Sequence, residues 1–272
     1  EFRRVLFRSF VTRRCMQCIP CLERRKQEWT GRLLMETKCW PPMSCTFMTL
    51  TYNPDRLPTD NSLRKKDTQD FWKRLRQQYP ASIRYFLCGE YGARKGRPHY
   101  HAICFGLPPT MSGYVSKAWS HGFVKCDFVT LSRMKYVAKY MTKSKREDAS
   151  NDMIELARMG RVEPEFRLMS NRPGIGVAYL KKLANAYLGG YIKEDGHTPM
   201  LPRDLVPDEG MYFRYGSRRY PLDAFCRRRL LELLDRTHDG DVKRVLEQSR
   251  CNGSRPAKIL GGDPPKGGVW GG

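Results

Sequence analysis

Runs of apolar, aromatic and threonine residues that end at glycine, proline or asparagine recur in the first half of the chain. Such runs are typical of β-strands. They lie at 45–52, 83–90, 97–106 and 122–129. A short loop rich in glycine and basic residues joins the second run to the third, so the simplest arrangement of these two predicted strands is an antiparallel pair.

Segments in which apolar residues recur every three or four positions predict helices around these strands. In 62–79, an apolar stripe of Leu63, Phe71, Trp72 and Leu75 is accompanied by several lysines and arginines, which is an amphipathic pattern. Further helices are predicted at 22–36, 114–119, 153–159, 173–187, 222–234 and 242–248. The mixture of elements predicts an α+β fold.

The segment 131–145 is also predicted to be helical, and its two sides differ in chemistry. When each residue is advanced by 100° around a helix, the apolar side is made of Met134, Val137, Ala138 and Met141. The opposite side is made of Tyr136, Lys139, Tyr140 and Lys143. The pattern therefore predicts that two phenols and two ammonium groups are turned away from the core together.

His99 and His101 lie in the predicted strand 97–106 and point to the same face, because side chains alternate along a strand. Neutral imidazole is a common metal ligand, so the pair is a candidate metal clip; the alternative is two unrelated histidines at the end of a strand. Glu90, at the end of the neighbouring predicted strand, is a candidate third ligand, the alternative being a solvated carboxylate near basic residues. Two histidines and one carboxylate suit Mn²⁺ or Mg²⁺, and zinc stays open.

The charge of the chain points to a polyanionic partner. A formal net charge of +22 over 272 residues favours nucleic acid. A membrane surface is the competing polyanion, but no apolar run approaches the roughly 20 residues that span a bilayer. The ten cysteines suggest a reducing cytosol rather than a disulfide framework.

Three cysteines near the start of the chain have the spacing of a metal site. Cys15, Cys18 and Cys21 could bind a structural Zn²⁺, with Cys39 or Cys45 as the fourth ligand. An iron–sulfur run would require a cysteine at position 25, which is arginine. The alternative is a plain turn with thiols packed beneath it.

These features combine into one chemistry. A phenol with a pKa of about 10 is a weak nucleophile at neutral pH, but nearby lysines would lower that pKa by favouring the phenolate. A divalent ion bound by His99, His101 and Glu90 would polarise a scissile phosphate. Attack by a tyrosine on DNA would leave a 5′-phosphotyrosine and a free 3′-hydroxyl that can prime synthesis. A second tyrosine one turn away could take the next strand.

Three motifs occur in order along the chain: Thr49-Leu50-Thr51-Tyr52, Arg97-Pro98-His99-Tyr100-His101 and Tyr136-Val137-Ala138-Lys139-Tyr140. Together they resemble the motifs of the HUH endonucleases. The likeness is closer to the rolling-circle replication initiators of microviruses, which are small single-stranded DNA phages. It covers roughly residues 15–185.

The resemblance implies a central antiparallel sheet of about five strands flanked by helices, with a mainly helical C-terminal extension. It implies that the metal ligands are His99, His101 and Glu90, and that the nucleophiles are Tyr136 and Tyr140 with Lys139 beside them. The cofactor would be Mg²⁺ or Mn²⁺. DNA contacts are assigned to Lys143, Arg97 and Arg172; the last lies beside glycines before a predicted helix, where a phosphate can bind.

Four segments are expected along the chain. Residues 1–9 resemble the translation of a sequencing adaptor and are set aside as a non-native leader. Residues 10–147 would form the nuclease core with the cysteine-rich segment, and 148–251 a basic helical accessory region. The tail 252–272 is rich in glycine and proline and is expected to be disordered.

The expected function is that of an endonuclease that nicks single-stranded origin DNA and later rejoins the strands. It would act in the cytoplasm of an infected bacterial host, with the host helicase and polymerase as partners. Two alternatives stay open. A non-enzymatic, zinc-stabilised nucleic-acid-binding protein explains the charge and the cysteines, but not the two sides of the tyrosine helix. A relaxase or transposase would share the chemistry and differ in biological role.

Overall fold

Four stretches of the chain are described by the computed structural model: 14–92, 96–142, 152–190 and 211–235. Every structural feature reported below concerns these residues. The predicted helix 242–248, the leader 1–9 and the tail 252–272 lie outside them.

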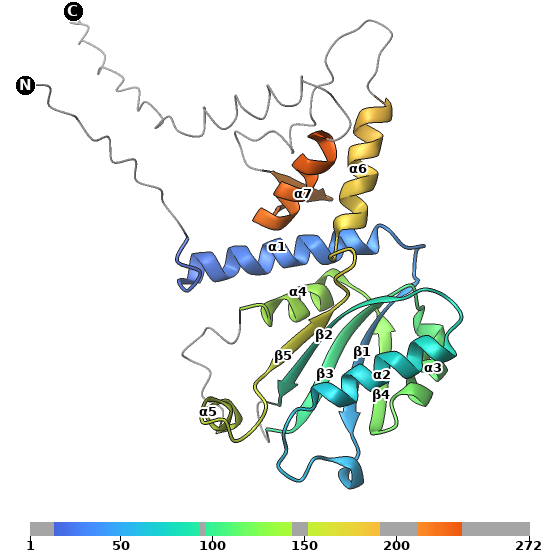
Figure 1. Cartoon of the computed structure of the whole chain (residues 1–272), viewed down its shortest axis with the longest axis vertical. Coiled ribbons are helices and arrows are strands. Elements are labelled where there is room, and N and C mark those ends of the chain that lie inside the picture. The colour runs from blue at the N-terminus through green and yellow to red at the C-terminus, as the bar shows by residue number, and fades with distance from the viewer. Residues whose placement is uncertain (1–13, 93–95, 143–151, 191–210, 236–272) are drawn as a thin grey trace, which may run out of the picture.

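A five-stranded antiparallel sheet forms the centre of the fold, in the order β4-β1-β3-β2-β5 (Figure 1). Its strands are β1 (Cys45–Tyr52), β2 (Arg84–Tyr91), β3 (Pro98–Phe105), β4 (Gly122–Phe128) and β5 (Phe166–Met169). The α+β class, the four predicted strands and the antiparallel pairing of the second with the third are confirmed. The edge strand β5 was not located from the sequence.

The two faces of the sheet carry two separate hydrophobic clusters, as side-chain alternation requires. On β3, Tyr100, Ala102 and Cys104 belong to the cluster covered by α2 (Lys65–Gln78) and α3 (Ser112–Ala118), whereas Ile103 and Phe105 belong to the other. The second cluster lies under α1 (Ile19–Thr37) and α4 (Leu131–Lys139). His99 and His101 have the same parity as Ile103, so they lie on the α1 and α4 side.

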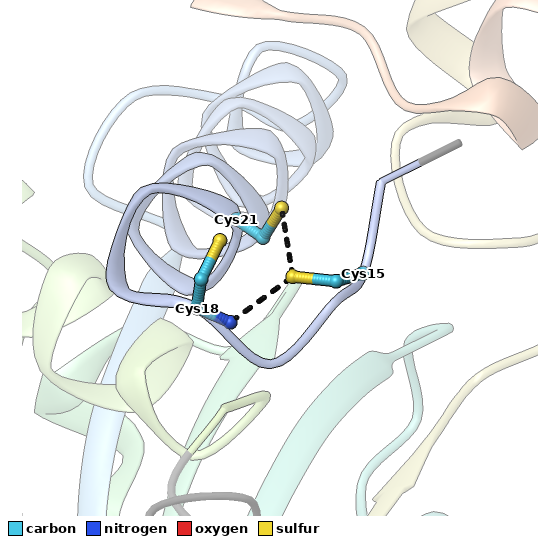
Figure 2. Close-up of side chains that lie close together, drawn as sticks. All are labelled: Cys15, Cys18 and Cys21. Carbon is cyan, nitrogen blue, oxygen red and sulfur yellow. Dashed lines mark hydrogen bonds between the residues drawn. The ribbon is translucent and has the colours of Figure 1, made fainter. Parts of the chain in front are cut away.

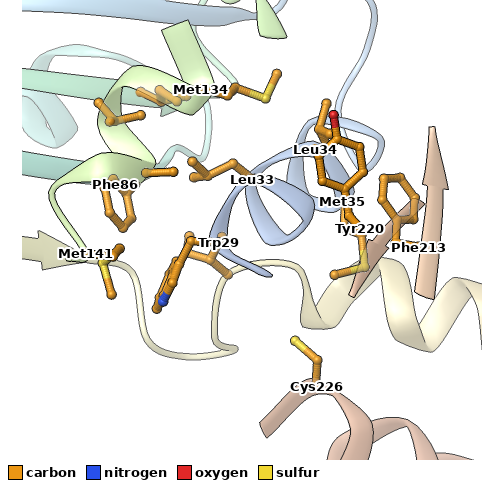
Figure 3. Packing of buried hydrophobic residues seen from close by; sticks show 14 of the residues in the cluster. Trp29, Leu33, Leu34, Met35, Phe86, Met134, Met141, Phe213, Tyr220 and Cys226 are labelled. Carbon is orange, nitrogen blue, oxygen red and sulfur yellow. The ribbon is translucent and has the colours of Figure 1, made fainter. Parts of the chain in front are cut away.

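Helix α1 is buried on two sides, which its basic sequence did not suggest. Figure 3 shows one side against the sheet and α4, through Trp29, Leu33, Phe86, Met134 and Met141. The other side meets a β-hairpin, through Leu34, Met35, Phe213 and Tyr220. A Cβ added at Gly31 would lie 2.8 Å from the Cβ of Tyr220, so glycine permits this close approach.

The elements beyond α1 come from the second half of the chain. They are α6 (Val177–Gly190), the hairpin β6 (Tyr212–Tyr215) and β7 (Arg218–Pro221), and α7 (Ala224–Asp235); α5 (Asp152–Arg158) precedes β5. Predicted helices correspond to α5, α6 and α7, but the hairpin was not predicted in the mainly helical extension. None of the described helices combines the length and hydropathy that a bilayer crossing requires.

Candidate active site

Cross-strand register brings the predicted metal ligands together at one end of the sheet. Glu90 on β2 lies directly opposite His99 on β3, and Thr49 on β1 lies directly opposite His101. Directly opposed residues of neighbouring strands point to the same face. All four side chains therefore lie on the face covered by α4.

One carboxylate oxygen is shared by both imidazoles. Glu90 Oε1 lies 2.9 Å from His99 Nε2 and 2.9 Å from His101 Nε2. The ligand atoms of the three residues all lie within 4.8 Å of one another. Glu90 is only 4 % exposed, so its charge is held inside the protein.

The outer ring nitrogens are fixed by the neighbouring backbone and side chains. His99 Nδ1 lies 3.1 Å from the carbonyl oxygen of Arg97, which can only accept, so this nitrogen donates. His101 Nδ1 lies 3.0 Å from Thr49 Oγ1. Partners of this kind hold an imidazole in the orientation that a metal ligand requires. Thr49 received no role from the sequence, although its place in the Thr49-to-Tyr52 motif was the available signal.

The donor set fits a divalent cation. In the neutral tautomer with a proton on Nδ1, the Nε2 lone pair of His99 faces Glu90 Oε1, so positive charge must lie between the two acceptors. Burial raises the pKa of Glu90, but hydrogen bonds with His101 and His99 outweigh it and hold that pKa well below its usual range. Two imidazoles and a carboxylate suit Mn²⁺, Mg²⁺ or zinc, so these three residues could hold such an ion.

Both candidate nucleophiles meet this cluster. The hydroxyl of Tyr136 donates to Glu90 Oε1 at 2.7 Å and lies 3.4 Å from His101 Nε2. The hydroxyl of Tyr140 donates in turn to that of Tyr136 at 3.0 Å. Lys139 Nζ lies 3.8 Å from the ring centroid of Tyr136 and 4.9 Å from that of Tyr140. The structure thus brings together the three ligand residues, both tyrosines and the lysine.

The tyrosines differ from the sequence prediction in orientation. Helix α4 ends at Lys139, and Tyr140 is its C-cap rather than a residue of a longer helix. Tyr140 is only 6 % exposed, so the phenols are not turned away from the protein together. The physical reason is that α4 lies between α1 and the sheet, and both of its sides are covered (Figure 1).

The acidity of Tyr136 also differs from expectation. Burial, followed by the hydrogen bond to Glu90, raises the pKa of this phenol above its ordinary value. The lysine-induced lowering of the phenol pKa is therefore not what this arrangement produces. The close carboxylate acts on the hydroxyl more strongly than the ammonium above the ring.

The three predicted DNA contacts have different surroundings. Arg97 donates from Nη2 to the Tyr52 carbonyl at 2.6 Å, beside the histidines. The Arg172 carbonyl accepts from Arg84 at the start of β2, six residues before Glu90, which is about 20 Å along a strand. The structure therefore places Arg172 away from the site. Lys143 lies outside the described residues.

The cysteine motif forms a second cluster, at the N-terminus of α1 (Figure 2). Cys15 Sγ lies 3.8 Å from Cys21 Sγ, and the three sulfur atoms lie within 4.8 Å of one another. The backbone N–H of Cys18 donates to Cys15 Sγ at 3.3 Å, and this bond, followed by one from Gln17, lowers the pKa of Cys15 to about 6.

The expected fourth cysteine ligand is wrong. Cys39 follows the C-terminus of α1, and 18 residues of helix separate it from Cys21 by about 27 Å. Cys45 is buried at the start of β1, in the core under the sheet. Neither thiol can join the cluster, because a rigid helix holds them apart.

Comparisons with known proteins cover the same region. Residues 45–145 match the family model of the replication-associated protein ORF2, and this range contains all three ligand residues and both tyrosines. The chain is 30% identical over 152 residues to the replication-associated protein VP4 of Bdellovibrio phage phiMH2K, covering 47% of each. It is 32% identical over 152 residues to the replication-associated protein ORF4 of Chlamydia phage 1, covering 47% of this chain and 37% of the relative.

A third relative is the replication-associated protein ORF2 of Spiroplasma virus 4, at 30% identity over 153 residues and 47% of each chain. The matches span less than half the length of each of these relatives. No solved structure matches the chain. The resemblance to phage replication initiators that the sequence motifs indicated is confirmed.

Proposed function

We propose that this relative of the phage replication-associated proteins initiates replication by nicking single-stranded origin DNA, with Tyr136 and Tyr140 as nucleophiles. One observation carries the proposal. The Tyr136 hydroxyl lies 2.7 Å from a carboxylate oxygen that two imidazoles share, and the Tyr140 hydroxyl lies 3.0 Å from that of Tyr136. Two nucleophilic oxygens thus adjoin three convergent metal ligands.

His99, His101 and Glu90 would hold Mg²⁺ or Mn²⁺. Such an ion, when bound, supplies Lewis-acid polarisation of the scissile phosphate and offsets the charge that develops on its oxygens. The protein's part is to keep the ligands in place. The Arg97 carbonyl orients one imidazole and Thr49 Oγ1 the other.

The reaction is a transesterification that conserves the number of phosphodiester bonds. The phenolic oxygen forms a bond to phosphorus as the bond from phosphorus to the 3′ oxygen breaks. The phenol loses its proton and the 3′ oxygen gains one, so the products are a 5′-phosphotyrosine and a free 3′-hydroxyl. Glu90 Oε1 is the acceptor that already faces the Tyr136 proton. Rejoining is the reverse attack by a 3′-hydroxyl.

Lys139 has a place in this step that its position explains. Its ammonium lies over the ring of Tyr136 and near that of Tyr140. An ammonium at this distance stabilises a phenolate more than a neutral phenol. Lys139 would therefore support whichever tyrosine carries the negative charge.

The partners follow from the products. The net charge of +22 favours binding of a polyanion, here single-stranded origin DNA. A free 3′-hydroxyl is the substrate of a polymerase, and continued synthesis requires strand separation. The host helicase and polymerase, in the cytoplasm of an infected bacterium, would supply both.

Covalent capture tests the proposal even where the origin sequence is unknown. The protein is incubated with Mn²⁺ and an end-labelled random library of single-stranded DNA, then denatured. We expect a labelled adduct that survives denaturation and maps by mass spectrometry to the peptide containing Tyr136 and Tyr140. Sequencing the captured strands gives the recognition sequence. A salt-sensitive complex with no covalent product would instead identify a non-enzymatic binder.

For the cysteine cluster we propose a structural Zn²⁺, bound by Cys15, Cys18 and Cys21. Zinc–sulfur bonds of about 2.3 Å at tetrahedral angles place sulfur atoms about 3.8 Å apart, and the Cys15–Cys21 separation is 3.8 Å. The ion would tie the cysteine turn to the first turns of α1. Arg25, in the same part of α1, donates to the carbonyl of Met141 just after the tyrosines, so this site would steady the nucleophile segment.

Cobalt substitution distinguishes this site from the histidine site. Co²⁺ bound by thiolates is expected to give a near-ultraviolet sulfur-to-metal absorption band, since soft thiolates select such ions. The band should disappear in Cys15→Ser and Cys21→Ser. It should persist in Cys39→Ser, a matched control outside the cluster, and in His99→Ala. Absence of the band from the unchanged protein, or its survival in Cys15→Ser, would contradict the assignment.

A further inference from the structure

The metal ligands continue across the sheet as two rows of opposed residues. The first row runs through Glu90, His99, Thr51 and Phe123, on β2, β3, β1 and β4. The second row runs through Cys88, His101, Thr49 and Lys125 on the same strands. Residues of each row share one face. Phe123 and Lys125 therefore lie on the same face of the sheet as the candidate site.

The β4 end of these rows is open to solvent. Phe123 is 66 % exposed and belongs to neither hydrophobic cluster. The side chain of Lys125 is 75 % exposed. Its nearest carboxylate, Asp127, is 3.9 Å away and is already paired with Arg133 at 3.0 Å. An aromatic ring and an ammonium thus stand side by side on a solvated shelf next to the histidines.

The spacing suits a strand of DNA that crosses the sheet. Phe123 is two strands from His99, which at about 4.8 Å a strand is roughly 10 Å. A phosphate held at the three ligands would place a flanking nucleotide over Thr51 and toward Phe123. Proteins that bind single strands combine stacking aromatic rings with basic groups along the backbone, and this shelf has both.

We propose that Phe123 stacks on the base of a nucleotide that flanks the scissile phosphate, with Lys125 contacting the adjoining backbone. This inference rests on the proposed function, because the scissile phosphate defines the register. Base stacking is tolerant of sequence, so Phe123 would position the strand and contribute affinity rather than read the origin.

The strand β4 provides its own control. Phe128 is also exposed, at 44 %, but lies opposite Thr46, whose hydroxyl donates to the Leu107 carbonyl on the other face. Phe128→Ala therefore removes an exposed ring of the same kind from the same strand, away from the site. Any general effect of losing surface aromatics would appear in both variants.

Affinity is measured by fluorescence anisotropy on a captured oligonucleotide, in a Tyr136→Phe/Tyr140→Phe background so that covalent trapping does not contribute. Phe123→Ala is expected to weaken binding about 5- to 150-fold, the equivalent of one stacked base. Phe123→Trp should retain affinity, and Phe128→Ala should leave it unchanged. Equal affinities of Phe123→Ala and the parent would overturn the proposal.

Abasic substitution locates the contact. Oligonucleotides with one base removed at successive positions are compared with the intact strand. The loss caused by Phe123→Ala should vanish at one position next to the nick, because that base no longer has a ring to stack on. A loss of equal size at every position would overturn stacking. Failure of the otherwise unchanged protein to form an adduct would instead contradict the proposed function, which separates the two outcomes.

Discussion

Replacing both Tyr136 and Tyr140 with phenylalanine is expected to abolish the covalent DNA adduct, with a loss of roughly a thousand-fold or more. Each single substitution should leave measurable adduct. The reason is geometric: the two hydroxyls lie 3.0 Å apart beside the same carboxylate, so either oxygen is near the candidate metal site. The measurement is adduct yield on a captured oligonucleotide after denaturation.

Tyr215→Phe is the matched control for these substitutions. It removes a phenolic hydroxyl from the β6 strand, and the ring beneath Lys38 is kept. Its adduct yield should equal that of the unchanged protein. Undiminished adduct in the double variant would end the assignment of both nucleophiles, and complete loss in one single variant would show that the two are not interchangeable.

The second large effect is expected from His99→Ala. Loss of a partner that merely orients a ligand costs about 10- to 100-fold in metal affinity or activity, so loss of the ligand itself should reduce nicking by more than about 100-fold. DNA affinity should change little, because most of it comes from charge distributed over the protein. Nicking rate and anisotropy, measured on the same oligonucleotide, test both halves of the prediction.

His121→Ala is the appropriate comparison. That imidazole lies beside Tyr52 and Trp119, in the cluster on the other side of the sheet, and is 4.0 Å from Asp67. Nicking should be unaffected by its loss. Manganese binding followed by calorimetry should weaken in His99→Ala only. Equal losses of nicking and DNA affinity in His99→Ala would indicate that the histidine supports folding rather than chemistry.

Much of the site could be predicted because strand alternation is a local rule. The spacing of His99 and His101 decides that they share a face, and the apolar run around them decides that they lie in a strand. Glu90 could be added because a short loop makes its strand pair antiparallel with the next. No contact beyond adjacent strands is needed for these conclusions.

Other features depended on contacts between distant segments. The short strand β5 and the hairpin β6–β7 carry too few residues for a clear period, and they are defined by their pairing. Arg172 looked like a phosphate contact, but its loop is held at the opposite end of β2 by Arg84. Phe123 gave no sequence signal, because its alignment with His99 requires β1 to lie between β4 and β3.

By itself, the amino-acid sequence determined the elements, the ligand types and the faces on which they lie, since each depends on a period of two or 3.6 residues along one segment. Tertiary structure alone decided that Tyr136 and Tyr140 turn toward Glu90, that Cys39 cannot reach the cysteine cluster, and that Phe123 continues the histidine row. These outcomes depend on how whole helices and strands are placed against one another, and no local period specifies that placement.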